Sequence, residues 1–164
     1  MFLLLLFNKK LLEILKADFA EKKPRNIFDV LSLVREFPRF RQEILEKLVQ
    51  YNKNLTSDIV FCPSSHDVHQ DHQVIHREAL RAFKNKTLLG YEFMWNNYNF
   101  SSSLFMKLSK KNIDKKIQAI NAYKSQTKRL YTKDELILGQ ANFRGLQIST
   151  DYAEAFEAIR VIYD

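Results

Sequence analysis

Segments with helical and strand-like patterns alternate along this chain, and this alternation restricts the possible folds more than any other feature. The β-branched run Ser57–Cys62 ends at Pro63 and is typical of a short buried strand. A polar loop follows, and apolar residues at helical spacing predict a helix that begins near Asp71. Strands that alternate with helices predict an α/β domain with a mostly parallel sheet flanked by helices. In such sheets ligands bind beyond the carboxyl ends of the strands, so a site is expected in the loop after Cys62.

The rest of the chain continues the same pattern. We expect further strands at Leu88–Trp95 and Leu104–Leu108, and further helices at Lys9–Glu21, Phe40–Asn52, Asn112–Tyr123 and Asp151–Ile162. The apolar run Met1–Phe7 is far shorter than the roughly 18–20 residues that span a bilayer. It also lacks the flanking signals of a secretory leader. We expect no membrane span there, but either a buried strand or residues that result from a misplaced translation start.

Length, cysteine content and charge narrow the class of protein. A chain of 164 residues fits one domain, residues 1–164, with a core of its own. The single cysteine, Cys62, excludes an internal disulfide and fits a reducing compartment, so we expect a cytoplasmic protein. The net charge of +7 favours a polyanionic partner, and lysines concentrate between Lys107 and Lys133. That stretch is either a solvated helical face or part of a nucleic-acid-binding module.

The strongest single signal is a cluster of histidines in the loop and helix after the strand. All four histidines of the chain lie within eleven residues: His66, His69, His72 and His76. Imidazole is the commonest metal ligand, and carboxylates orient ligating histidines. We expect function for His69 and His72, which bracket Asp71, and ordinary surface positions for the other two. His72 and His76 have the spacing of the two histidines in H-E-x-x-H metalloproteases, but Gln73 occupies the position of the catalytic glutamate.

Residues 63–72 read P-S-S-H-D-V-H-Q-D-H, and this run follows a hydrophobic strand and precedes a helix. Its tail, H-Q-D-H, resembles the second conserved motif of the LmbE/PIG-L zinc-dependent N-deacetylases. Downstream, A-Y-K-S-Q at 122–126, R-G-L-Q at 144–147 and Y-A-E-A-F at 152–156 resemble the bacterial branch of that family. The resemblance extends from about Leu33 to the carboxy terminus. It implies a Rossmann-like α/β fold.

The resemblance implies a hydrolase that removes the acetyl group of an N-acetylglucosamine-type sugar or its conjugate, with Zn²⁺ as cofactor. By the family pattern, His72 is a zinc ligand. His69 stabilises the tetrahedral oxyanion or protonates the leaving amine, and Asp71 orients His69 and raises its pKa. Arg144 and Gln126 resemble substrate-binding positions. Each of the two has two possible roles. It either contacts sugar hydroxyls or a phosphate of the substrate, or it serves the structure, as Arg144 would in a salt bridge.

The chain departs from the family pattern in its first third. Between Met1 and Ser57 it contains no H-P-D-D, no histidine and no two adjacent acidic residues. We therefore expect an incomplete domain that lacks the family's first strand, two zinc ligands and the general base. Zinc and activity are expected to be weak or absent, because a catalytic zinc usually has three protein ligands. The alternatives are a fragment from a misplaced start or disrupted gene, a non-catalytic relative, or a site rebuilt from His66, Asp67, His69 and His72.

Two further functions compete with deacetylation. A non-catalytic relative would bind sugars or a partner subunit, and a basic module would bind nucleic acid through Lys107–Lys133 with its tyrosines, Tyr123 and Tyr131. The histidine cluster favours the deacetylase class, so we expect no specific nucleic-acid partner. Trp95, with three asparagines close by, is either a sugar-stacking platform or a strand end and turn. A homo-oligomer is compatible with the family resemblance.

Overall fold

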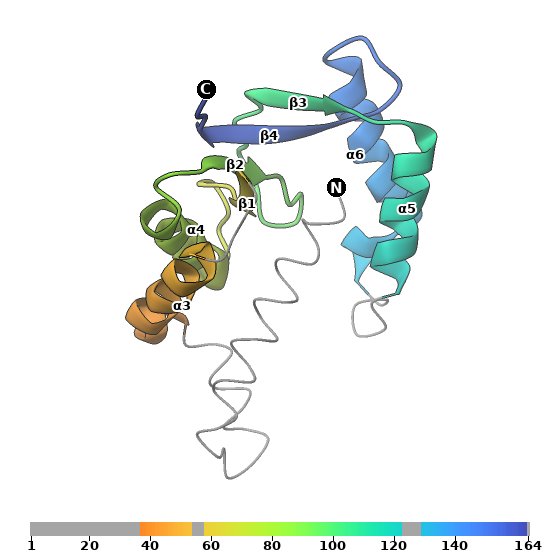
Figure 1. Cartoon of the computed structure of the whole chain (residues 1–164). Helices are drawn as coiled ribbons and strands as arrows, with labels where there is room; N and C mark the ends of the chain where they lie inside the picture. Colours follow the sequence, from red (N-terminus) through yellow and green to blue (C-terminus); the bar gives the residue numbers. More distant parts are fainter. Residues whose placement is uncertain (1–36, 54–57, 123–128, 164) are drawn as a thin grey trace.

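The computed structural model describes residues 37–53, 58–122 and 129–163, which form an α/β unit (Figure 1). The structure thereby confirms the α/β class. The strand predicted at Met1–Phe7 and the helix predicted at Lys9–Glu21 lie outside the described residues. The described elements are, in chain order, η1 (Phe37–Phe40), α3 (Arg41–Lys53), β1 (Ile59–Pro63), α4 (Gln70–Ala82), β2 (Thr87–Tyr91), β3 (Leu104–Lys107), α5 (Lys110–Asn121), η2 (Leu130–Thr132), α6 (Asp134–Leu146) and β4 (Ala153–Arg160).

The four described strands form one sheet with the order β1-β2-β4-β3. β1 and β2 pair in parallel, with Ile59 opposite Thr87 and Pro63 opposite Tyr91. This pairing is parallel because α4 crosses over from the end of one strand to the start of the next. β4 pairs antiparallel with both β2 and β3. The described sheet is therefore mixed, with one parallel and two antiparallel pairs, whereas the sequence predicted a mostly parallel sheet.

Alternation along the strands divides the core between the two faces of the sheet. Val60 and Cys62 of β1 and Leu88 of β2 belong to a core cluster with residues of α3 and α4. Tyr91 points to the opposite face, where it packs with Phe156 of β4. α6 packs against β4. Figure 1 shows α3 and α4 on one side of the molecule and α5 and α6 on the other.

The segment Asp151–Ile162 contains a strand and not the predicted helix. β4 lies between β2 and β3 and is hydrogen-bonded to both. Its apolar residues occur at spacings that fit a helix, and alanine and glutamate are weak strand formers, so the local sequence favours a helix. Pairing on both sides outweighs this local preference, because the backbone groups of a central strand all gain partners.

The other predicted elements within the described residues are confirmed with shifted ends. The helix predicted to begin near Asp71 begins at Gln70, and the strand predicted for Leu88–Trp95 ends at Tyr91. α6 lies where no element was predicted. Its two glycines and its apolar residues on several sides obscured the helical period. No described helix combines the length and the apolar character needed to cross a membrane.

Candidate functional site

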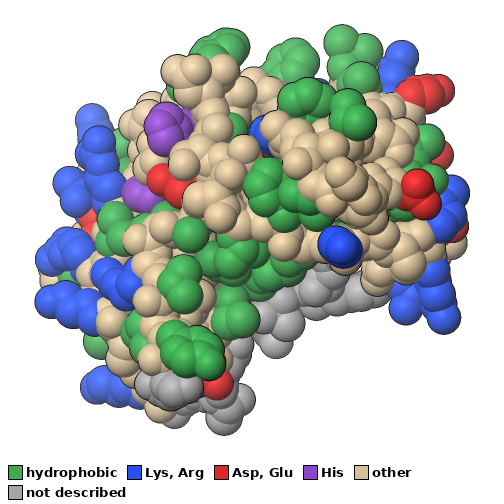
Figure 2. Space-filling model, turned by 90° about the horizontal axis from the view of Figure 1, so that it is seen from above, with side chains coloured by type: hydrophobic (Ala, Val, Ile, Leu, Met, Phe, Trp, Pro, Cys, Tyr) green, Lys and Arg blue, Asp and Glu red, His purple; other side chains and the backbone are tan. Residues whose placement is uncertain are grey.

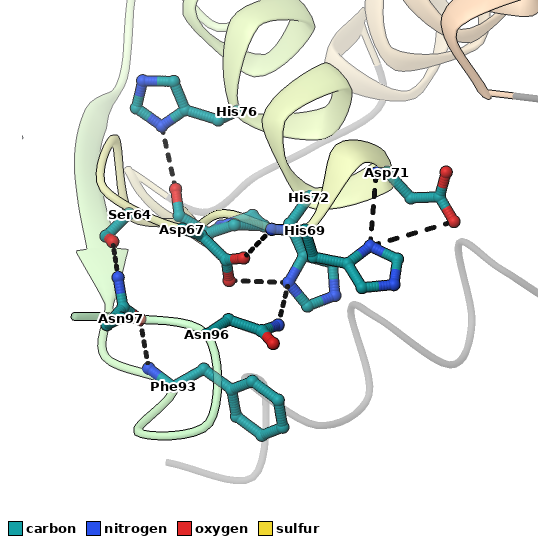
Figure 3. A network of polar contacts seen from close by, with 10 residues as sticks. Ser64, Asp67, His69, Asp71, His72, His76, Phe93, Asn96 and Asn97 are labelled. Carbon is teal, nitrogen blue, oxygen red and sulfur yellow. Dashed lines mark hydrogen bonds and ion pairs between the residues drawn. The ribbon is translucent and has the colours of Figure 1, made fainter.

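The histidine cluster lies at the edge of the sheet where the parallel strands β1 and β2 both end (Figure 3). The chain leaves β1, forms the loop 64–69 and enters α4. A second loop, residues 92–97, leaves β2 at the same edge because the two strands run in the same direction. The Asn97 side chain joins the loops, since its amide donates a hydrogen bond of 2.7 Å to Ser64 Oγ. The histidine cluster therefore lies at the carboxyl ends of the parallel strands, where the sequence placed it.

Asp67 and His72 form the central contact of the site. His72 Nδ1 lies 2.6 Å from Asp67 Oδ2, and the Asp67 side chain is fully buried. The other carboxylate oxygen accepts the His69 N–H at 2.8 Å, which fixes the carboxylate. Asn96 Nδ2 also approaches His72 Nδ1, but at 3.4 Å, so the shorter contact with Asp67 decides the position of the ring proton. Nδ1 donates to Asp67, and Nε2 keeps its lone pair for a metal ion or a proton.

His69 caps the amino terminus of α4. Its Nδ1 accepts the Asp71 N–H at 3.2 Å, so the neutral ring carries its proton on Nε2. The Asp71 carboxylate lies 4.0 Å from the same nitrogen, beyond hydrogen-bond distance. The sequence predicted that Asp71 orients His69. In this structure the backbone N–H of Asp71, and not its carboxylate, forms the hydrogen bond to the His69 ring. Burial raises the pKa of Asp71, and the nearby His69 and His72 partly offset the increase.

The two remaining histidines differ in burial. His66 is exposed, as predicted, and its Nδ1 lies 3.0 Å from Ser65 Oγ. The predicted surface position of His76 is wrong, because this side chain is buried and its Nδ1 lies 2.8 Å from the Pro63 carbonyl oxygen. It lies one turn beyond His72, on the side of α4 that faces β1. His76 therefore holds the helix to the end of the strand.

Glu157 of β4, a strand in the middle of the sheet, is hydrogen-bonded to the loop 64–69, which we call the site loop. Gly90 of β2 lies opposite Glu157, and a β-carbon at Gly90 would come within 2.9 Å of Glu157 Oε2 and of Ser64 Cα. Glycine therefore gives the carboxylate room to reach Ser65, whose N–H and hydroxyl both donate to it. No sequence pattern indicated this role, because the two residues are far apart in the chain. The loop that carries Asp67 is thus attached to β4 as well as to β1.

Arg144 of α6 forms an ion pair with Glu92, the first residue after β2. Nε donates to one carboxylate oxygen at 2.8 Å, and Nη2 donates to the other. Both side chains are nearly buried. Of the two roles that the sequence allowed for Arg144, the structural salt bridge is therefore present. This pair and a second ion pair, Lys116 with Glu154, line a small cavity. Gln126, the other predicted substrate residue, lies outside the described residues.

The described residues offer one imidazole nitrogen to a ligand but no complete metal centre. Among them, no group of three or more histidine, cysteine or acidic side chains is arranged to hold an ion. His72 fits one ligand position, because Asp67 occupies Nδ1 and leaves Nε2 available. Asp71 Oδ1 is buried and has no hydrogen-bond partner among the described residues. This oxygen can therefore also accept a hydrogen bond or bind an ion. A catalytic zinc would require further ligands from elsewhere.

Comparison with known proteins supports the fold. No protein-family model matches the chain, and no curated protein matches it. Among solved structures, the conserved protein TT1542 from Thermus thermophilus is similar, with 28% sequence identity and a TM-score of 0.60. The similarity covers 72% of this chain and 59% of that protein, so this chain spans only part of the length of its relative. The shared fold agrees with the α/β class.

Proposed function

We propose that the site is that of a zinc-dependent N-deacetylase of the LmbE/PIG-L type, which hydrolyses the acetamido group of an N-acetylglucosamine-type sugar. One observation carries this proposal: the contact of 2.6 Å between Asp67 and His72 at the carboxyl end of a parallel strand pair. A buried carboxylate on one imidazole nitrogen leaves the other nitrogen available to an ion, as in carboxylate–histidine–zinc sites. When bound, zinc polarises the acetyl carbonyl and lowers the pKa of water.

The two histidines have separate roles in this proposal. His72 presents Nε2 as a zinc ligand, and Asp67 fixes the orientation of the ring and the position of its proton. The His69 ring lies 4.7 Å from the His72 ring, and its Nε2 carries the proton that a leaving amine needs. About half of the His69 side chain is exposed, so a substrate can approach this ring.

Zinc retention tests the role of His72. We expect the wild-type protein to bind zinc only weakly in equilibrium dialysis, since the described residues supply no complete set of ligands, and His72→Ala to bind measurably less. Asp67→Asn should weaken zinc binding by about 10- to 100-fold, because a carboxylate bonded to a ligating histidine contributes that much. His66→Ala is the matched control, since His66 is exposed in the same loop, and it should bind zinc like the wild type. Amine release from N-acetylglucosamine should occur only in samples that retain zinc.

Equal zinc retention by His72→Ala and the wild type would contradict the proposed ligand. A second candidate function is a non-catalytic sugar-binding relative, and the described residues favour it in one respect, since they assemble no group of three metal-binding side chains. Such a protein would need Asp67 and His72 only as a structural pair. No zinc retention by the wild type, together with N-acetylglucosamine binding that survives His72→Ala, would therefore support this second candidate.

A further inference from the structure

A cluster of aromatic rings lies beside the histidines. The Phe93 ring contacts the His72 ring, with centroids 6.1 Å apart. Tyr131 contacts Phe93 at 5.1 Å and Trp95 at 5.8 Å. We call Phe93, Trp95 and Tyr131 the aromatic shelf, which is built from the loop 92–97 and from η2. Trp95 is 56% exposed, so a large apolar ring remains accessible next to the candidate site.

The aromatic shelf offers ring faces rather than amide groups. The sequence suggested a platform of Trp95 together with its neighbouring asparagines, Asn96, Asn97 and Asn99. In the structure, the Asn97 side chain serves the fold, because it accepts the Phe93 N–H at 2.8 Å and donates to Ser64 Oγ. Asn96 is buried against His72. The exposed Trp95 ring is therefore suited to a flat face, either an aromatic ring or the C–H side of a sugar.

The position of Trp95 separates it from the bond that would be hydrolysed. Tyr131 and Phe93 connect Trp95 to His72, and each contact in this series spans more than 5 Å between ring centroids. A sugar whose acetamido group lies at His72 would be next to Phe93, the first ring of this series, whereas Trp95 is the last. A group that reaches Trp95 is therefore one that is attached to the reacting sugar.

We propose that the exposed face of Trp95 binds a second ring carried by the substrate, either an adjoining sugar ring or an aromatic aglycone. This inference rests on the proposed function for the placement of the reacting sugar at His72. Both kinds of second ring present the same chemistry, a flat and partly apolar face. Glycosides and short oligosaccharides are then preferred over the free monosaccharide, which lacks the contact with Trp95.

Trp95 is the only tryptophan of the chain, so fluorescence excited at wavelengths that tyrosine does not absorb reports its environment alone. Three probes compare one ring with two: N-acetylglucosamine, N,N′-diacetylchitobiose and phenyl N-acetyl-β-glucosaminide. At least one two-ring probe should change the emission of Trp95 and bind about tenfold more tightly than the monosaccharide, the factor that about 1.4 kcal/mol gives. The probe that binds more tightly identifies the second ring as a sugar or an aromatic group.

Calorimetry with variants separates this inference from the zinc proposal. Trp95→Ala should lose the tenfold preference, and Trp95→Phe should keep most of it. Tyr98→Ala is the control, because Tyr98 is 85% exposed nearby in the sequence but is not part of the aromatic shelf. His72→Ala should keep the two-ring preference, so the zinc proposal can fail without removing this result. Equal affinities for all three probes, no binding of the two-ring probes, or an unchanged preference in Trp95→Ala would overturn the inference.

Discussion

Cys62 shows how position in the core determines the chemistry of a side chain. It is fully buried in β1 and packs in the core formed with α3 and α4. Burial, with a smaller contribution from the charge of Glu157, raises the pKa of the Cys62 thiol to about 12. Because the thiolate is the reactive form of cysteine, Cys62 is excluded as a nucleophile although it lies next to the site loop.

The Cys62 thiol should react with DTNB at about pH 8 in the unfolded protein and not in the folded one. The folded state keeps the proton up to a pKa of about 12, whereas the unfolded thiol loses it near the ordinary value of 9.0. Between these values the unfolded state binds fewer protons, so stability should fall as pH rises. Urea unfolding at about pH 8 and about pH 10.5 measures this fall, and Cys62→Ala should lack the part due to the thiol. Equal DTNB labelling of folded and unfolded protein would contradict this account.

The histidine spacing predicted that His69 and His72 lie close together, and their rings are 4.7 Å apart because His69 precedes α4 and His72 lies in its first turn. The partner of His72 could not be identified in this way. Asp71 is the sequence neighbour, but the loop 64–69 folds so that Asp67 reaches His72 at 2.6 Å. The burial of His76 likewise depends on which side of α4 faces β1. Spacing thus predicts which side chains gather, and the loop conformation decides which of them are paired.

The element α6 contains two glycines in different surroundings. A β-carbon at Gly139 would meet nothing within 4 Å, whereas one at Gly145 would lie 2.5 Å from the Thr150 carbonyl oxygen. The turn between α6 and β4 packs against Gly145, whose own carbonyl accepts the Thr150 N–H at 3.0 Å. Only Gly145 is therefore required by packing.

Alanine substitutions at these two positions should change stability in opposite directions. Gly139→Ala should stabilise the protein by about 0.5–1 kcal/mol, because alanine loses less backbone entropy than glycine in a helix. Gly145→Ala should destabilise it by about 1–3 kcal/mol, since the backbone of the following turn must move to admit a methyl group. Urea unfolding of both variants gives the comparison. Stabilisation by both substitutions would show that the turn does not pack closely on α6.

The sequence predicted those elements whose local pattern and tertiary environment agree. α4 has apolar residues on one face at helical spacing, and β1 is a β-branched run that ends at a proline, so both were predicted. β4 was predicted as a helix because its neighbours in the sheet, and not its own residues, determine its conformation. Single-chain patterns contain no information on such long-range pairing, and the antiparallel half of the sheet could not be predicted from them.

At the scale of the whole molecule, the sheet brings together parts of the site that are far apart in the chain. The loop 64–69 follows β1, the loop 92–97 follows β2, and Glu157 reaches the first loop from β4. Tyr131 comes from η2 and completes the aromatic shelf next to His72. A substrate at this edge would therefore contact groups that only the folded sheet places side by side.

The net charge of +7 raises the question of whether the molecule binds nucleic acid. On the face shown in Figure 2, Lys and Arg side chains gather along the left edge, and smaller groups lie elsewhere on the face. On α5, where the sequence concentrates lysines, Lys110 pairs with Asp114 and Lys116 pairs with Glu154. These pairs reduce the charge that the helix can offer to a polyanion.

We expect oligonucleotide binding, measured by fluorescence anisotropy, to be weak and to decline steeply between about 50 and 200 mM salt, because neutralised phosphates release counterions. Lys111→Glu, on the exposed side of α5, should weaken this binding modestly, whereas His72→Ala should not change it. Tight binding at about 150 mM salt that Lys111→Glu abolishes would favour a nucleic-acid-binding module. Such a result would leave the pairing of Asp67 with His72 as a structural contact, because a polyanion-binding surface has no need of a prepared imidazole at a strand end.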